Sequence, residues 1–423
     1  MLTLRHKIEQ EIRERGPIPF SRYMELCLYD PGLGYYSRNS EQFGKAGDFY
    51  TSSDVHAVFG RLLARQFEQM WRILDLPEQI ELIELGPGRG LFAQDVLDWS
   101  QKKFPEFFCV LRYVLVETSP ALRQRIGETL AQHIGTGRAA LAEPDALEID
   151  GPVLPVTAAK RRQNAAHGAS RGYGTGQEQA PKGRKKAAMT EAATDSVPTI
   201  IFANEFFDAL PVEILSQKGS LRIDAQDGRF IETWVSASTQ ELEFLDRYSV
   251  HPEPGERIEA PLAAQEAMNQ IAATMPRGFF VAIDYGYTRE EQLAGRHRGT
   301  IKAIRQHSIS GSPYEAPGEQ DITADVNFTA LAAAAEKHGM STQKLITQSQ
   351  FLLGIGEANQ FADAFEECRL PQERAKVALQ LKHLVTPAGM GESFHVLIAS
   401  KGIEPEKAAA LAGLNFGHAL ARG

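Results

Sequence analysis

Short apolar runs alternate along the chain with segments in which apolar residues recur at helical spacing. Two of these runs are followed closely by helical segments, at 90–104 and 119–134, and ESFHVLIAS (392–400) predicts a strand near the C-terminus. Buried strands that alternate with helices are typical of a parallel sheet. The pattern predicts an α/β fold with a mostly parallel sheet. The strands expected to form its centre are IELIEL (80–85), VLRYVLVE (110–117), TIIFAN (199–204) and GFFVAIDYG (278–286).

Composition breaks this pattern at one place. Residues 160–186 carry eight Lys or Arg against one acid, Glu178, with few apolar side chains. Such a segment buries too little apolar surface to offset its ordering entropy. A disordered basic insertion is therefore expected over 155–197, and a solvated loop is favoured there over a nucleic-acid contact. The other expected units are an N-terminal helical and lid region (1–75), the two halves of the sheet core (76–154 and 198–286), an added lobe over the sheet (287–330), and C-terminal helices with closing strands (331–423).

Charge and cysteine content exclude several classes of protein. No apolar run approaches the ~20 residues of a membrane span, and the charged start of the chain is no secretory signal. Cys27, Cys109 and Cys368 lie far apart, so neither a disulfide framework nor a metal motif is expected, and a cytosolic location is predicted. The net charge of -9 gives no reason to bind nucleic acid. Whether the chain forms a homo-oligomer stays open.

A glycine-rich turn follows the first predicted core strand, in Glu84-Leu85-Gly86-Pro87-Gly88-Arg89-Gly90. Its spacing is G-x-G-x-G, whereas the dinucleotide fingerprint needs G-x-G-x-x-G and a Walker loop needs G-K-[ST]. The spacing resembles that of class I methyltransferases, which bind S-adenosylmethionine. Gly86, Gly88 and Gly90 would let the backbone approach the cofactor, and Glu84 can face its ammonium group.

A second acid, Glu117, ends the next predicted strand. A carboxylate at this strand end can accept hydrogen bonds from both ribose hydroxyls of a nucleoside cofactor. The alternative is an exposed residue at a strand end. NAD sites use the same geometry, so only the glycine spacing separates the two cofactors.

Polar side chains also follow the two later core strands. Asn204 ends TIIFAN, and Glu205 and Asp208 follow it, where the transferable methyl group would lie. Carboxylates there could hold a guanidinium and help it lose a proton, although either acid could instead cap a helix. Asp284 closes the next strand and could equally be a turn former. These residues are the candidates for catalysis and for the acceptor side.

Long sequence blocks resemble the MidA-type methyltransferases, a family that includes mitochondrial complex I assembly factors which methylate a protein arginine. The resemblance implies a class I methyltransferase (Rossmann-like) sheet, S-adenosylmethionine as cofactor, and a protein substrate, with a respiratory-complex subunit as one candidate. It also implies that Asp48 closes over the cofactor and that Asp321, Thr323 and Asn327 lie on the acceptor side. The blocks include GDFYTS (47–52), ELGPGRG (84–90), NEFFDALP (204–211), IDYGY (283–287) and DITADVNF (321–328).

Other functions stay open at this point. The chain could bind the cofactor as an assembly protein with little turnover, or it could methylate a small molecule. An NAD-dependent oxidoreductase is the weakest alternative because of the glycine spacing. His56 and His307 lie in the matched blocks without metal-ligand spacing, and the expected chemistry needs no metal.

Overall fold

The main sheet has the order β15-β17-β10-β5-β2-β3-β4 in the computed structural model, which describes residues 3–37, 57–142, 196–305, 308–309 and 311–416. The five strands from β10 to β4 are parallel, and β17 is antiparallel to β10. This arrangement confirms the predicted α/β class. The strands are β2 (Ile80–Leu85), β3 (Leu111–Val116), β4 (Ala139–Leu141), β5 (Thr199–Asn204), β10 (Gly278–Tyr287), β14 (Val326–Asn327), β15 (Ser341–Thr342), β16 (Ile346–Thr347) and β17 (Phe394–Lys401).

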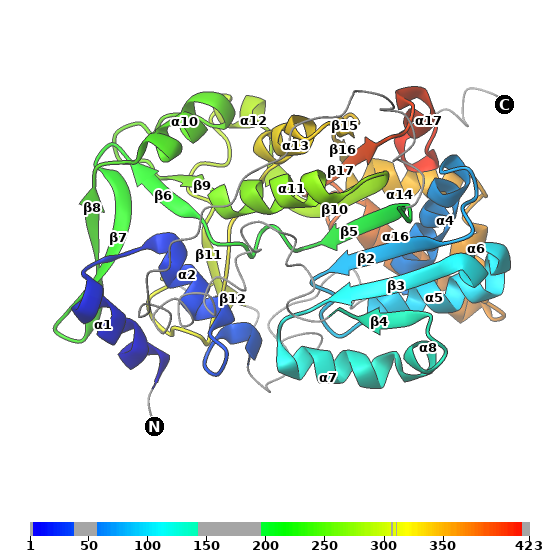
Figure 1. Ribbon diagram of the computed structural model, residues 1–423, viewed down its shortest axis with the longest axis horizontal. Helices are drawn as coiled ribbons and strands as arrows, with labels where there is room; N and C mark the ends of the chain where they lie inside the picture. The colour runs from blue at the N-terminus through cyan, green and yellow to red at the C-terminus, as the bar shows by residue number, and fades with distance from the viewer. Residues whose placement is uncertain (1–2, 38–56, 143–195, 306–307, 310, 417–423) are drawn as a thin grey trace, which may run out of the picture.

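Helices cover both faces of this sheet (Figure 1). Strand β10 shows why: Phe279 and Val281 pack into one hydrophobic cluster, whereas Phe280 and Ala282 pack into the other. Successive side chains of a strand point to opposite faces, so a strand that is apolar throughout needs cover on both. One face is covered by α4 (Ala57–Ile73), α5 (Leu91–Lys103), α6 (Pro105–Val110), α14 (Gln348–Glu357), α15 (Ala362–Phe365), α16 (Pro371–Val385) and α17 (Pro405–Ala409), and the other by α11 (Leu262–Thr274) and α13 (Phe328–Lys337).

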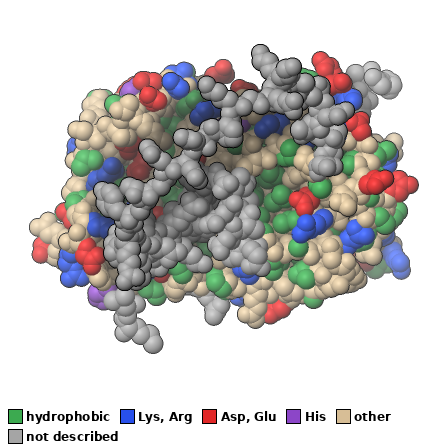
Figure 2. All heavy atoms as spheres, in the orientation of Figure 1, with side chains coloured by type: hydrophobic (Ala, Val, Ile, Leu, Met, Phe, Trp, Pro, Cys, Tyr) green, Lys and Arg blue, Asp and Glu red, His purple; other side chains and the backbone are tan. Residues whose placement is uncertain are grey.

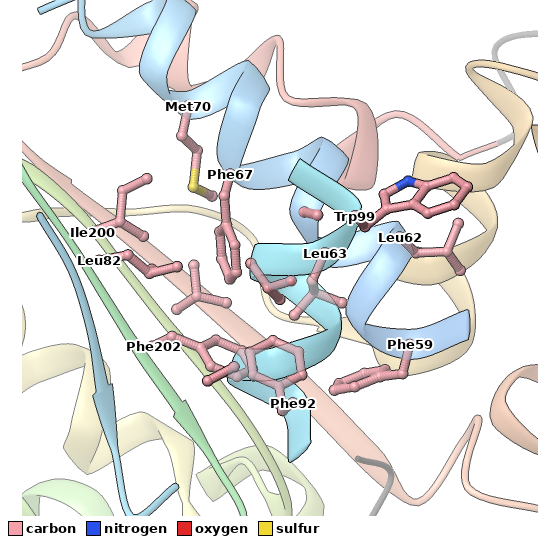
Figure 3. Packing of buried hydrophobic residues seen from close by; sticks show 14 of the residues in the cluster. Phe59, Leu62, Leu63, Phe67, Met70, Leu82, Phe92, Trp99, Ile200 and Phe202 are labelled. Carbon is pink, nitrogen blue, oxygen red and sulfur yellow. The ribbon is translucent and has the colours of Figure 1, made fainter. Parts of the chain in front are cut away.

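Aromatic side chains fix α4 and α5 against the sheet (Figure 3). Phe92 of α5 stacks on Phe202 of β5 with ring centroids 4.6 Å apart, and Phe67 of α4 meets Phe202 edge-on at 5.6 Å. All three rings are buried. Because α5 begins directly after the glycine turn, this packing also fixes the turn relative to β5.

A second body combines the N-terminal helices with two small antiparallel sheets. The larger sheet has the order β1-β7-β6-β9, with β8 paired to β7, and the smaller has the order β12-β11-β13. Residues from α1, α2, β7, β11 and β13 share one hydrophobic cluster, so they form one unit. The elements are α1 (Leu4–Arg15), β1 (Ile18–Pro19), α2 (Phe20–Tyr29), β6 (Glu213–Ser216), β7 (Gly219–Gln226), β8 (Arg229–Val235), α10 (Thr239–Tyr248), β9 (Ile258–Ala260), α12 (Arg289–Leu293), β11 (Lys302–Arg305), β12 (Ser308–Ile309) and β13 (Asp321–Thr323).

The division of the chain into units stays a prediction. The β6–β9 sheet falls within 198–286, a range that the sequence assigned to the core. The basic insertion lies almost entirely outside the described residues, as does the GDFYTS block with Asp48. Within the described ranges, no helix combines the length and apolar character that a membrane crossing requires. Acidic and basic side chains are interspersed on the face that Figure 2 shows.

The strand order reverses at β2, which pairs with β3 on one side and with β5 on the other. In open α/β sheets, ligands bind at the carboxyl ends of the strands beside such a reversal. In Figure 1 the arrowheads of β2, β3 and β5 point toward the region of α2 and β11. The ligand-binding edge of the sheet therefore faces the second body.

Candidate functional site

The glycine turn leaves β2 in a left-handed backbone conformation. Gly86, Gly88 and Gly90 have φ values of 64°, 54° and 76°, which glycine adopts without the steric cost of a Cβ. The Gly86 N–H donates to the Val116 carbonyl at 3.1 Å and so ties the turn to the end of β3. A Cβ on Gly86 would lie 3.1 Å from the Phe206 ring, whereas one on Gly88 would meet no atom of the described chain within 4 Å. The backbone at Gly88 is therefore open to a ligand.

Glu84 is buried in β2 just before this turn. The Tyr113 hydroxyl donates to its Oε2 at 2.8 Å. Burial raises the pKa of Glu84 to about 8, although the Tyr113 hydrogen bond lowers it in part. A cationic group placed beside the carboxyl would favour its ionised form, which fits the predicted ammonium contact.

Glu117 follows β3 at the same edge of the sheet. Its Oε1 accepts the N–H groups of Thr118 at 2.8 Å and Ser119 at 2.7 Å, and Oε2 has no hydrogen-bond partner in the described part of the chain. Burial raises the pKa of Glu117 to about 7, although the hydrogen bonds from these two N–H groups lower it in part. The fixed carboxyl with one oxygen available suits the predicted ribose contact.

The segment after β5 begins with backbone strain. Glu205 has φ = 50°, and its N–H donates to the Ile283 carbonyl at 2.9 Å. Its carboxylate accepts the Asn204 Nδ2 amide at 3.0 Å. Non-glycine residues in this conformation cost of order 1–3 kcal/mol and cluster at functional sites. Residues 205–212 form turns rather than a helix, so neither Glu205 nor Asp208 caps one.

Asp208 is buried beside this strained residue. The Tyr285 hydroxyl donates to its Oδ2. Its Oδ1 and the Oδ1 of Asn204 are both buried, and neither has a hydrogen-bond partner among the residues described. Burial raises the pKa of Asp208 to about 6, against the lowering effect of Tyr285. Buried acceptor oxygens are nearly always paired, so these two atoms are available to accept hydrogen bonds from a ligand.

Asp284 is engaged by the backbone, and its predicted place on the acceptor side stays a prediction. It is 1% exposed, and its Oδ2 accepts three backbone N–H groups, from Phe206 at 3.2 Å, Phe207 at 3.0 Å and Asp208 at 3.3 Å. Its Oδ1 accepts the Tyr285 N–H at 3.0 Å. Burial and the charges of Asp208 and Glu205 raise its pKa well above the usual range. With both oxygens engaged, Asp284 positions the 205–208 segment.

Asn327 also has a structural task, and its predicted acceptor contact stays a prediction. It caps α13: its Oδ1 accepts the Ala330 N–H at 3.0 Å, and its Nδ2 donates to the Tyr248 carbonyl at 2.9 Å. Both ends of the amide are used. The sequence carried this signal, because an Asn directly before an Ala-rich helical run is a typical N-cap.

Asp321 and Thr323 lie in β13, whose end is tied to the 205–208 segment. The Ala324 N–H donates to the Asp208 carbonyl at 3.0 Å and joins the end of β13 to the 205–208 segment. The Tyr36 hydroxyl donates to Asp321 Oδ1 at 3.0 Å. Sequence reasoning did not single out Tyr36 or Tyr285, although Tyr285 lies in the IDYGY block (283–287). Over the described ranges, no three His, Cys, Asp or Glu side chains gather as a metal site.

A family model for S-adenosyl-L-methionine-dependent methyltransferases matches residues 62–346. The chain belongs to this family. It is 28% identical to the Drosophila melanogaster protein arginine methyltransferase NDUFAF7 homolog, mitochondrial, over 95% of this chain and 85% of that protein. The human NDUFAF7 protein is also 28% identical, over 93% of this chain and 82% of its own length. A crystal structure from Burkholderia thailandensis, bound to S-adenosyl-homocysteine, covers 97% of this chain and 94% of its own, with 27% identity and a TM-score of 0.74.

These findings confirm the resemblance, the class I methyltransferase fold and S-adenosylmethionine as the cofactor. The methyltransferase is therefore no NAD-dependent oxidoreductase. The predicted cytosolic location is contradicted, because the relatives are named as mitochondrial proteins. Sparse cysteines indicate a reducing environment, which is not specific to one compartment. The roles of the individual site residues stay predictions.

Replacing Gly88 by Ala tests the cofactor turn. The new Cβ has room in the protein but lies where the cofactor would approach, so we expect affinity for S-adenosylmethionine to fall by about tenfold or more, as measured by calorimetry. Gly137→Ala is the matched control, because Gly137 also has a positive φ (73°) and open space for a Cβ. It precedes β4 at the amino end of the parallel strands. Both variants should lose about 1–2 kcal/mol of stability, and equal cofactor affinities in the two would contradict the assignment.

Glu84→Gln tests the raised pKa of the buried acid. A carboxyl whose folded-state pKa lies above its unfolded value adds stability that is full below the unfolded pKa and is lost as pH rises through the folded pKa. In the wild type this loss runs from about pH 4.5 to about pH 8. We expect the free energy of unfolding of Glu84→Gln, relative to wild type, to increase over that range, by roughly 1–4 kcal/mol at pH 8.5.

Urea denaturation at pH 5 and pH 8.5 measures this difference. Glu81→Gln is the control, because Glu81 lies on the same strand and pairs with Arg112 at 3.0 Å near the surface. A Glu84→Gln variant whose stability relative to wild type stays constant with pH would show that Glu84 is ionised normally.

Proposed function

We propose that this enzyme transfers a methyl group from S-adenosylmethionine to an arginine side chain of a protein. The observation that carries the proposal is the pair of buried, unpaired acceptor oxygens, Asn204 Oδ1 and Asp208 Oδ1, after β5. A guanidinium offers five N–H donors and no acceptor, so it complements a pocket whose available atoms are acceptors. The names of the relatives, protein arginine methyltransferase, support the same acceptor.

The charge around these oxygens favours a cation. Asp208, Asp284 and Asp321 are all buried at this edge. The nearby cation Lys302 pairs with Asp325 at 2.9 Å, with its Nζ 5.0 Å from the centre of the Tyr285 ring. A positively charged side chain would be attracted into this acidic pocket, and a neutral small molecule would gain less.

The residues at the neighbouring strand ends fit the cofactor. In the proposed assignment the backbone at Gly86, Gly88 and Gly90 lies against its methionyl part, Glu84 faces its ammonium group, and Glu117 accepts the ribose hydroxyls. Asp48 belongs to the same proposal through the family block, but it lies outside the described residues. When bound, the cofactor supplies a methyl group on a sulfonium centre, which leaves as a neutral thioether.

The chain's own residues would orient the acceptor nitrogen and take its proton. Asp208 Oδ1 and Asn204 Oδ1 would accept guanidinium N–H groups and so fix the nitrogen for an in-line displacement. Since Tyr285 already donates to Asp208 Oδ2, Oδ1 is the oxygen left to take the proton that the methylated nitrogen releases. Glu205 adds a second carboxylate that favours the cation.

The proposal includes a protein substrate, for which a respiratory-complex subunit is one candidate, and self-association stays open within it. Two alternatives give different products. A small-molecule methyltransferase would leave acid-soluble label after incubation with labelled cofactor and lysate. An assembly protein that binds the cofactor without turnover would transfer no label to protein or to a small molecule.

Asp208→Asn tests the role of the carboxylate. We expect wild type to yield methylarginine in protein, detected by mass spectrometry after incubation with S-adenosylmethionine and lysate, and the variant to lose about 100-fold or more of the rate. Because the carboxyl must be ionised to act as a base and its pKa is about 6, the wild-type rate should fall below about pH 6. The variant should bind the cofactor normally.

Asp246→Asn serves as the control, since the Asp246 side chain is 65% exposed on α10. Full methyl transfer by Asp208→Asn would remove Asp208 from the mechanism. Label on protein lysine instead of arginine would contradict the proposed acceptor.

A further inference from the structure

Two tyrosines from the N-terminal elements border the pocket described above. Tyr29 ends α2, and Tyr36 lies in the short helix η1 (Tyr35–Ser37). Their ring centroids are 5.5 Å apart with the planes inclined by 33°. Tyr35 is buried and backs Tyr36 edge-on at 5.2 Å. The pair forms one continuous aromatic surface, and both members are partly exposed.

Hydrogen bonds from the hydroxyl groups hold these rings in place. The Tyr29 hydroxyl donates to the carbonyl of Ala209, next to Asp208, at 2.8 Å. The Tyr36 hydroxyl donates to Asp321 Oδ1 at 3.0 Å. Tyr29 is thus tied to the segment that contains Asp208, and Tyr36 is tied to Asp321 in β13.

The same pair also reaches the cofactor side. The Ser119 hydroxyl donates to the Tyr36 carbonyl at 2.7 Å, and Ser119 lies two residues after Glu117. Burial raises the pKa of Tyr29 well above its usual range, and the negative charges of Asp321, Asp208 and Glu117 raise it further. Tyr29 and Tyr36 therefore lie near Glu117, the acid predicted to bind the ribose, and near Asp208 and Asp321.

Aromatic rings in an acidic surrounding are suited to bind cations. The face of a phenol ring carries partial negative charge and attracts a guanidinium or ammonium group within about 6 Å. Arginine also stacks its planar guanidinium on aromatic faces. The carboxylates add charge attraction to the contact with the rings.

We propose that Tyr29 and Tyr36 form the aromatic wall of the acceptor pocket and bind the cationic side chain that receives the methyl group. This inference rests on the proposed function in one respect, that the acceptor is a cation. The rings bind and orient the acceptor, whereas the carboxylates hold its N–H groups. Neither tyrosine is required to bind the cofactor.

The first test separates the ring of Tyr29 from its hydroxyl. Tyr29→Leu removes both, and Tyr29→Phe removes only the hydroxyl. With an arginine-containing protein substrate, we expect Tyr29→Leu to raise KM by roughly 3- to 30-fold while kcat and the Kd for S-adenosylmethionine stay within about twofold. Tyr29→Phe keeps the ring and should raise KM by clearly less than Tyr29→Leu does. Tyr36→Leu provides a second variant if Tyr29→Leu unfolds at a lower temperature.

Tyr23→Phe is the matched control. Tyr23 lies in the same helix, and its hydroxyl likewise donates to a backbone carbonyl, that of Pro313, at 2.9 Å. The Tyr23→Phe variant should have the same KM as wild type. A KM increase of equal size in Tyr23→Phe and Tyr29→Leu would show a general loss of N-terminal packing and would overturn the proposal.

A binding measurement makes the outcome independent of turnover. Nα-acetyl-arginine methylamide is titrated into enzyme saturated with S-adenosylhomocysteine, with the neutral citrulline analogue for comparison. We expect saturable binding of the arginine compound alone, weakened in Tyr29→Leu and Tyr36→Leu. Absence of binding to wild type, or equal binding of the citrulline analogue, overturns the aromatic wall. Binding that depends on the rings, without methylarginine formation, would support the aromatic wall and refute the proposed function. Methylarginine formation with an unchanged KM in both Leu variants would support the proposed function and refute the aromatic wall.

Discussion

The site depends on one buried carboxylate, that of Asp284. Its oxygens accept the backbone N–H groups of Phe206, Phe207, Asp208 and Tyr285, and it lies on the strand next to β5. Without these bonds, the polar backbone of the segment after β5 would be buried without partners, at a cost of about 1–3 kcal/mol for each group. They also hold Glu205 in its left-handed conformation and thereby fix where Asp208 lies.

The order of the strands explains why distant segments meet at this point. β2, β3, β5 and β10 are parallel neighbours in register, so the residues that follow them come to the same edge. The glycine turn, Glu117, Asn204 and Asp284 all lie at that edge although about 200 positions separate the first from the last. The second body then closes the edge from outside through Tyr29, Tyr36 and Asp321.

Several acids at this edge are held in conditions that oppose ionisation. Burial raises the pKa of Glu84 to about 8, that of Glu117 to about 7 and that of Asp208 to about 6. These carboxyls reduce the stability of the fold progressively as the pH rises from about 4 to about 8. Such a cost is typical of sites built for a ligand, and a cationic acceptor together with a cationic cofactor would recover part of it. The site and the stability of the protein are therefore linked through the same side chains.

The sequence alone determined the α/β fold, the cofactor and the family, because periodicity and glycine spacing are local properties of the chain. Strands 80–85 and 199–204 were predicted with the residues that the structure shows, and Asp208, Asp321 and Thr323 do meet at one edge. Only the tertiary structure decided that Asp284 and Asn327 serve the backbone, and that the hydroxyl groups of Tyr29, Tyr36 and Tyr285 donate to Ala209, Asp321 and Asp208. These roles depend on which hydrogen-bond partners arrive from other elements. A residue type at a strand end reveals what a side chain can bind, whereas packing determines which of its atoms are already used.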